Sequence, residues 1–148
     1  MITKLRKTFS PEIDALAEKI IGIAFTVHNK LGHGFLEKVY ENALMIEFRK
    51  NKLMAEQQIP IKVFYDEQVV GDYCADIIAE KELIIEIKAV ENLNKKFEAQ
   101  LVNYLTATKH DVGLLINFGE KVEVKRKYRK YLNPENPEIS CQDSYDSH

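Results

Sequence analysis

Two acids and a lysine stand in neighbouring apolar stretches of the chain. Asp76 lies in the first stretch, and Glu86 and Lys88 lie in the second. Both stretches are typical of β-strands, and the polar pair Glu80-Lys81 between them predicts a hairpin turn. Because side chains alternate along a strand, Glu86 and Lys88 point to one face, and the hairpin brings Asp76 close to them.

The charges of these three residues suit a site for a divalent cation. Charged groups among apolar neighbours are costly unless they meet each other, a metal ion or a ligand. Carboxylates supply the hard oxygen ligands that such cations prefer, and a lysine beside them can stabilise negative charge. We therefore predict a cation site with a charge stabiliser. The alternative is a structural ion pair between Lys88 and Glu86.

Two amphipathic helices are predicted before the hairpin. Ser10 and Pro11 are typical of a helix start, apolar residues then recur at helical spacing, and Gly32 is a natural helix end. The second helix is predicted from about Leu36 to Lys52. The apolar residues expected to face inward there are Val39, Ala43, Ile46 and Leu53.

The rest of the chain predicts a mixed sheet and one more helix. Segments 59–65, 69–79 and 83–88, joined by short polar turns, predict an antiparallel meander. Helical spacing returns near Phe97, and the apolar run from Val112 to Asn117 should then pair in parallel with a neighbouring strand. The segment from Val122 fits either a strand or a helix. The predicted fold is α/β in the order ααβββαβ, a mixed β-sheet flanked by helices.

The composition is that of one ordinary soluble domain. The chain has 148 residues, of which 45% are hydrophobic and 30% charged, and a net charge of −2. It has no apolar run long enough for a membrane span and starts without an apolar signal region, so a cytoplasmic location is expected. Its 2 cysteines are too few for a disulfide framework or a zinc site. We place one domain at residues 1–132 and a polar acidic tail at 133–148.

A run of bases, called the basic strip below, precedes that tail. Residues 121–131 hold six bases and one acid, whereas residues 133–148 hold four acids and no lysine or arginine. Such a run is either a solvated surface or a patch that faces phosphate. We take the second interpretation as the prediction. The residues expected to bind nucleic acid are Lys125, Arg126, Lys127, Arg129 and Lys130.

The predicted hairpin resembles the PD-(D/E)XK nuclease superfamily. The motif is matched by Asp76 followed by Glu86, Ile87 and Lys88, and the αβββαβ core of the superfamily agrees with the predicted order. Ala75 stands where the superfamily name has proline, a residue that is not itself catalytic. The resemblance implies a restriction-endonuclease-like core.

Three further stretches, in the right order, resemble one branch of that superfamily, the GxxExxY family. They make the resemblance more specific, because Glu-x-Lys alone is common by chance. The similarity covers residues 13–119. The matching stretches are Gly34-Phe-Leu-Glu37-Lys-Val-Tyr40, Gln100-Leu-Val-Asn-Tyr104-Leu and Gly113-Leu-Leu-Ile-Asn117-Phe-Gly119.

The resemblance also implies a metal site. Asp76, Glu86 and the carbonyl of Ile87 would hold Mg²⁺ or Mn²⁺, with water completing the coordination. An acid from the second helix, Glu37, would reach the metal directly or through water. The alternative for Glu37 is a solvent-facing helix glutamate.

The remaining implied roles concern the phosphate. Lys88 would stabilise the charge that develops on the scissile phosphate. Gln100 and Tyr104 lie four residues apart on one helix face, and they would orient the strand of Glu86 or touch phosphate. Ordinary packing is the alternative for both.

The predicted function is metal-dependent hydrolysis of nucleic-acid phosphodiester bonds, with DNA favoured over RNA. Three alternatives stay open: a nuclease fold that binds nucleic acid without cutting it, a subunit that works through protein interaction, and a metal enzyme acting on a phosphorylated small molecule. The intact Asp-Glu-Lys set counts against the first. Any sequence specificity would have to come from loops, a partner or a homodimer.

Overall fold

The computed structural model describes residues 10–129, and the predicted acidic tail and Lys130 lie outside them. The observed order is ααβββαββ, so the predicted order is confirmed and the undecided last segment is a strand. The elements are α2 (Pro11–Leu31), α3 (Glu37–Lys50), β1 (Ala55–Tyr65), β2 (Gln68–Ala79), β3 (Leu83–Lys88), α4 (Lys95–Thr108), β4 (Val112–Phe118) and β5 (Val122–Tyr128).

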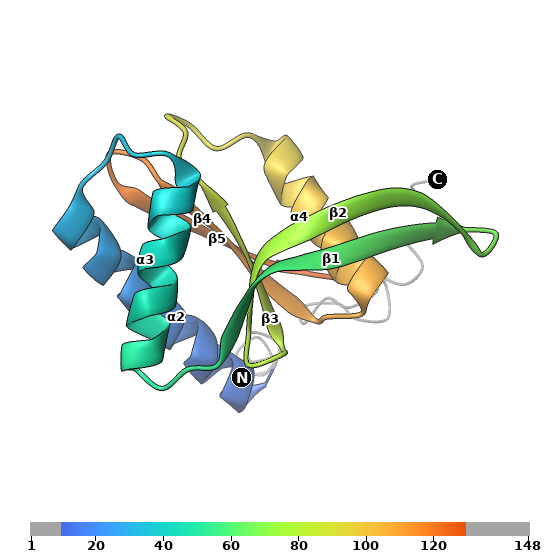
Figure 1. Cartoon of the computed structure of the whole chain (residues 1–148), viewed down its shortest axis with the longest axis horizontal. Coiled ribbons are helices and arrows are strands. Elements are labelled where there is room, and N and C mark those ends of the chain that lie inside the picture. Colours follow the sequence, from blue (N-terminus) through green and yellow to red (C-terminus); the bar gives the residue numbers. More distant parts are fainter. Residues whose placement is uncertain (1–9, 130–148) are drawn as a thin grey trace, which may run out of the picture.

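The five strands form one mixed sheet in the order β1-β2-β3-β4-β5 (Figure 1). Strands β1, β2 and β3 are antiparallel neighbours, as the meander prediction requires. Strand β4 pairs in parallel with β3 after the crossover through α4, and β5 pairs antiparallel with β4 at the edge. The prediction of a parallel, fully buried strand after the third helix is therefore confirmed.

Helices cover both faces of the sheet (Figure 1). One face packs against α2 and α3 and includes Ile85 and Ile87. The other packs against α4 and includes Ile84 and Leu115. Because side chains alternate along β3, Glu86 points to the α4 face with Ile84. The strand that carries the motif is thus buried on both sides. Within residues 10–129, no helix combines the length and the apolar character needed to cross a bilayer.

The helix ends follow the sequence signals, but one predicted helix face is wrong. Ser10 caps α2, and its hydroxyl oxygen accepts a hydrogen bond of 3.4 Å from the amide of Ile13. In α3, Val39 and Ile46 are predicted to face inward, yet they are 38% and 51% exposed. The inward face of α3 instead includes the carboxylate of Glu41, and apolar periodicity does not predict a charged residue on a buried face. The residues buried on α3 are Tyr40, Glu41, Leu44, Met45 and Phe48.

Strand β2 pairs with β3 over only a short length and then separates from it. Its pairing with β3 covers only Ile77–Ile85, Ile78–Ile84 and Ala79–Leu83. Its pairing with β1 continues to the far end of both strands. The far parts of β1 and β2, residues 59–75, project as a two-stranded arm beyond the body, which we call the arm (Figure 1). The strands separate next to the acidic motif.

Candidate active site

Asp76 and Glu86 are connected at the point where β2 separates from β3. The amide of Asp76 donates a hydrogen bond of 3.0 Å to Oε2 of Glu86, and the amide of Ile87 donates one of 2.8 Å to Oδ2 of Asp76. The main-chain pairing ends one residue earlier, at Ile77 and Ile85. Each carboxylate therefore satisfies a strand amide that no longer has a partner in the ladder. The hairpin brings the two acids together, as the sequence indicates.

The burial of these acids opposes their ionisation. Glu86 is 8% exposed, and burial together with the charge of Asp76 raises the pKa of Glu86 to about 8. Burial also raises the pKa of Asp76, although the hydrogen bond from the Ile87 amide opposes that rise. Two close carboxylates without a cation therefore hold at least one proton near neutral pH.

Lys88 lies beside the acids without forming an ion pair. Its Nζ is 4.4 Å from the centre of the Phe97 ring on α4. Its positive charge acts to lower the pKa of both Asp76 and Glu86. No ion pair within residues 10–129 includes Lys88. The interpretation of Lys88 as a structural ion-pair partner of Glu86 therefore has no support in the geometry.

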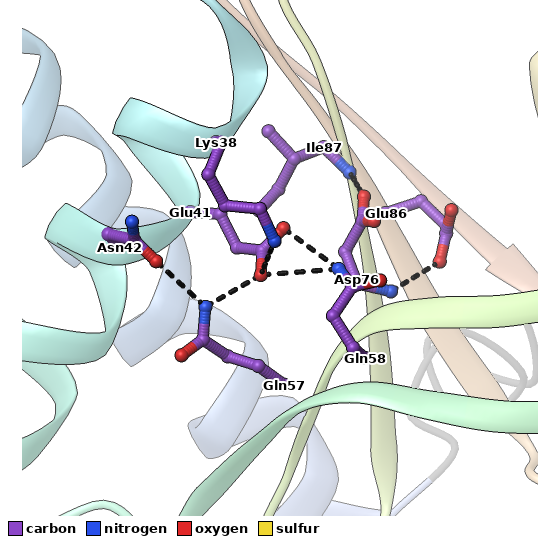
Figure 2. Close-up of polar contacts among 8 residues, drawn as sticks. All are labelled: Lys38, Glu41, Asn42, Gln57, Gln58, Asp76, Glu86 and Ile87. Carbon is purple, nitrogen blue, oxygen red and sulfur yellow. Dashed lines mark hydrogen bonds and ion pairs between the residues drawn. The ribbon is translucent and has the colours of Figure 1, made fainter.

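A third buried acid, Glu41, reaches the site from α3 (Figure 2). It is 3% exposed and accepts hydrogen bonds from Lys38 at 3.1 Å, Gln57 at 2.6 Å and Gln58 at 3.1 Å. Its charge adds to the burial that raises the pKa of Asp76. The sequence predicts Glu37 as the acid that this helix contributes and does not single out Glu41.

Glu37 lies one turn before Glu41 and is exposed at the start of α3. After burial and Asp76, its charge also raises the pKa of Glu86, so it lies within electrostatic range of the pair. The signal that could have found Glu41 is its spacing of four residues from Glu37, which puts the two acids on the same side of the helix. Two acids on α3 are thus candidates for contact with a cation.

Gln58 contacts both Glu41 and Asp76 with its side chain, and its backbone has an unusual conformation. It lies opposite Asp76 on β1 and has a φ of 52°, although the register on both sides of it is unchanged. This left-handed conformation costs about 1–2 kcal/mol for a residue with a Cβ. The Gln58 side chain hydrogen-bonds Glu41 and also lowers the pKa of Asp76 by hydrogen bonding. Sequence periodicity contains no signal for this conformation.

Gln100 and Tyr104 contact each other on the α4 side of the acids. The amide of Gln100 donates a hydrogen bond of 2.9 Å to the hydroxyl oxygen of Tyr104. Burial, followed by the charge of Glu86, raises the pKa of Tyr104 to about 12. Tyr104 therefore stays protonated at any physiological pH, with a hydroxyl hydrogen that can be donated. The structure places both predicted residues near the acid pair.

Two further motif residues brace the loops around the end of β3. Asn117 accepts a hydrogen bond from the amide of Val90 at 2.9 Å and donates one to its carbonyl at 2.8 Å. The hydroxyl of Tyr40 donates to the carbonyl of Gly32 at 2.8 Å, and its ring stacks on Phe118 with 4.5 Å between centres. These residues position loops and do not touch the acids. The φ of Gly34 is 106°, which explains a glycine there.

The basic strip lies on β5, which β4 separates from β3. Three of its described bases pair with acids outside β5 and a fourth pairs with an acid of β5, whereas Lys130 lies outside the described residues. The structure does not bring the strip to the acid pair. The ion pairs are Arg126 with Asp14, Lys127 with Glu98 at 3.0 Å, Arg129 with Asp111 at 2.9 Å, and Lys125 with Glu123 at 3.9 Å.

The donor atoms around Asp76 and Glu86 fit a hard divalent cation. Within residues 10–129, no three His, Cys, Asp or Glu side chains cluster closely enough to hold a metal alone. Two carboxylates, a main-chain carbonyl and waters would be the ligand set, which is common for Mg²⁺. The Ile87 amide points at Asp76, and the carbonyl of a strand residue lies on the same side as its amide. A cation there would also offset the repulsion between the buried acids.

The mixed sheet with its split hairpin and flanking helices is the α/β restriction-endonuclease-like fold. Residues 14–129 match the sequence profile of the PD-(D/E)XK nuclease superfamily. The chain belongs to this superfamily. The members of the superfamily generally use divalent metals, typically Mg²⁺ or Mn²⁺.

Two solved structures resemble the chain at low sequence identity. The crystal structure of SSO0001 has a TM-score of 0.53 and 18% identity, covering 75% of this chain and 58% of that one. An alkaline exonuclease from Laribacter hongkongensis has a TM-score of 0.49 and 9% identity, covering 74% of this chain and 64% of that one. This chain therefore spans less than two thirds of either protein. No curated protein sequence matched.

Proposed function

We propose that this protein is a metal-dependent nuclease that hydrolyses phosphodiester bonds of nucleic acid, with DNA favoured over RNA. The observation that carries the proposal is the pair of buried acids, Asp76 and Glu86, joined through strand amides beside the unpaired charge of Lys88. Membership of the PD-(D/E)XK nuclease superfamily supports it. Cytoplasmic nucleic acid is the expected substrate.

The proposed metal ligands are Asp76, Glu86 and the carbonyl of Ile87. Glu41 or Glu37 would approach from α3, with Glu41 favoured because it is buried and acts electrostatically on Asp76. A bound Mg²⁺ or Mn²⁺ would neutralise phosphate charge and lower the pKa of an attacking water. Gln57 and Gln58 would keep the Glu41 carboxylate in place.

The proposed role of Lys88 is to stabilise negative charge on the phosphate during cleavage. The Phe97 ring holds its ammonium group near the acids without neutralising its charge. Gln100 and Tyr104 would add hydrogen-bond donors on the same side, because the Tyr104 hydroxyl stays protonated. Preorganised donors of this kind typically contribute about 10²–10³ in rate each.

We also infer membership of the GxxExxY branch of the superfamily. The support is that Gly34, with its positive φ, and Tyr40, with its anchored hydroxyl, each perform a distinct structural task at the start of α3. Glu37, the acid of that signature, lies at the rim of the site.

A protein-interaction role is the second candidate, and the arm favours it. Phe64, Tyr65 and Val70 near its tip are 60%, 69% and 65% exposed. A monomer seldom exposes several large apolar side chains together without a partner. The two functions are compatible, because the arm tip lies beyond the acid pair along the same strands.

The proposal is tested by incubating the purified protein with labelled single-stranded DNA, duplex DNA and RNA in Mg²⁺, Mn²⁺ or EDTA. We expect cleavage with metal and none with EDTA. Glu86→Gln should abolish cleavage, because it removes a charged metal ligand while preserving the shape of the side chain. Glu91→Gln, which changes an exposed acid in the following loop, is the matched control. Cleavage that persists in EDTA or in Glu86→Gln, or no cleavage of any substrate with metal, would contradict the proposal.

A further inference from the structure

An open groove lies between the arm and α4. Its volume is about 760 Å³, within the range of about 300–1,000 Å³ that is usual for ligand pockets. One wall comes from the arm and the other from a face of α4. The residues that line the groove include Val63, Tyr73, Phe97, Gln100, Asn103 and Tyr104.

The groove opens onto the proposed catalytic centre. Phe97 lines the groove and also holds the ammonium group of Lys88. Tyr104 also lines the groove, and the charges of Glu86 and Asp76 contribute to the raised pKa of its hydroxyl. A ligand in the groove would therefore lie next to the acids.

The arm places an exposed aromatic ring in this groove. Tyr73 is 46% exposed, and its ring centre is 5.6 Å from that of Tyr104 with a tilt of 39°. The ring lies directly on the backbone of Gly71, where an added Cβ would come within 2.7 Å of it. Gly71 in turn pairs with Val63 of the same wall. The strand beneath the ring thus restrains its position, while nearly half of the residue remains exposed to a ligand in the groove.

The charge at the groove rim is positive. Lys96 lines the groove, and Lys95 precedes it at the exposed start of α4. The amide side chains of Gln100 and Asn103 lie along the same wall. Aromatic surface, flanking cations and amide groups together match a nucleotide, which carries an apolar base, a phosphate and polar base edges.

We propose that this groove binds an unpaired base of the substrate strand, stacked on Tyr73, while the adjoining phosphate lies at Lys88. This inference rests on the proposed nuclease function. Bases inside a duplex are stacked on their neighbours and present no free face to a side chain. The protein accordingly acts on single-stranded nucleic acid, or on unpaired nucleotides within a longer molecule.

The test measures binding of a short fluorescent DNA strand to the full chain in EDTA, which prevents cleavage. Tyr73→Ala should weaken binding about ten-fold, the size of one base–aromatic stack by alanine substitution. Tyr73→Phe should bind like the wild type, because it keeps the ring. Tyr65→Ala is the matched control, since Tyr65 is an exposed tyrosine of the same hairpin that does not line the groove.

Two other strands isolate the contribution of the base. An abasic strand of equal length should bind more weakly than the normal strand and should be insensitive to Tyr73→Ala. A blunt duplex should bind more weakly than the single strand. Gly71→Ala is a second variant that keeps the tyrosine but displaces its ring, and it should also weaken binding of the normal strand.

The outcomes separate this inference from the proposed function. If the wild type cleaves nucleic acid but Tyr73→Ala has no effect on binding, or has an equal effect on the abasic strand, the groove does not bind a base and the nuclease function stands. If the wild type neither binds nor cleaves nucleic acid, both are overturned. If Tyr73→Ala weakens binding of the normal strand but not of the abasic strand, the inference is supported.

Discussion

The main-chain amide of Asp76 donates its hydrogen bond to the side chain of Glu86, 3.0 Å away, at the position where the β2–β3 ladder has just ended. Asp76 in turn accepts the amide hydrogen of Ile87 at 2.8 Å. The separation of β2 from β3 therefore depends on the same two hydrogen bonds that hold the acids close together. These bonds keep two buried carboxylates side by side, where only one of them can easily be charged.

The stability of the metal-free protein should fall as the pH rises from about 4.5 to 8. Glu86 has a pKa of about 8 in the folded chain, against 4.5 for an ordinary glutamate, so the folded state binds the extra proton in this range. The stabilisation is complete below pH 4.5 and is lost as the pH passes through the folded pKa. Each unit of pKa difference corresponds to roughly 1.4 kcal/mol. Asp76, whose pKa is also raised, contributes with the same sign.

Melting curves in EDTA at a series of pH values check this prediction. In Glu86→Gln the decline should be much smaller, because that side chain cannot titrate. Saturating Mg²⁺ or Mn²⁺ should also reduce the decline in the wild type, since a cation favours the ionised acids. A wild-type melting temperature that rises between pH 5 and pH 8 in EDTA would show that the acids do not repel each other in the folded state.

Replacing Lys88 with alanine should stop cleavage without removing the metal site. The substitution removes a positive charge next to the acids but no oxygen ligand. We expect the rate to fall by about 10²–10³, the usual cost of losing one charge stabiliser. Metal affinity should stay equal or increase slightly, because a charge that repels the cation is removed. Single-turnover cleavage and calorimetry measure the two effects separately.

The control for this experiment is Lys62→Ala, which removes an exposed lysine on the arm that pairs with Asp72. It should leave the rate of cleavage nearly unchanged. If Lys88→Ala cuts as fast as the wild type, Lys88 has no role in cleavage and serves only to pack on Phe97.

The sequence was sufficient for the fold and for the central pair of acids, because both depend on local patterns. Period-two and helical spacings predict every element except the last strand, which they leave undecided, and the turn at Glu80-Lys81 fixes which residues of β2 and β3 meet. From that register, Asp76 and Glu86 must be neighbours. The helix cap at Ser10 is likewise a local signal that the structure confirms, and the parallel pairing of β4 follows from the helix that connects it to β3.

The parts that could not be predicted depend on contacts between distant elements. The pairing of Glu41 with Lys38 is local to α3, but the two amide groups that also compensate its burial come from Gln57 and Gln58 on β1. The left-handed conformation of Gln58 has no sequence signature. Three charges of the basic strip are matched by acids distant in the chain, as in the pair of Arg126 with Asp14.

The location of the phosphate-binding surface can be decided by the salt dependence of binding. The basic strip remains a proposed binding surface, but its ion pairs lead us to expect a larger contribution from Lys95 and Lys96 beside the groove. The slope of log affinity against log salt should become less steep by about 0.7–0.9 for each phosphate that the protein no longer neutralises. The double change of Lys95 and Lys96 to alanine should therefore flatten the slope.

The matched variant changes Lys125, Arg126 and Arg129 to alanine. It should flatten the slope less than the double variant does, and it should lower the melting temperature because it leaves Asp14 and Asp111 without their partners. If the slope flattens only in this triple variant, the substrate crosses β5, and the strip is the main surface that binds phosphate.

The central claim, that Asp76 and Glu86 form one site for a divalent cation, is tested most directly by calorimetric titration of Mn²⁺ into the full chain. We expect a single site in the wild type and little binding in Asp76→Asn, which removes the charge while keeping an oxygen that can accept the Ile87 hydrogen bond. Asp72→Asn, an exposed acid of the same strand, should bind like the wild type. No binding to the wild type at millimolar Mn²⁺, or unchanged binding in Asp76→Asn, would contradict the claim.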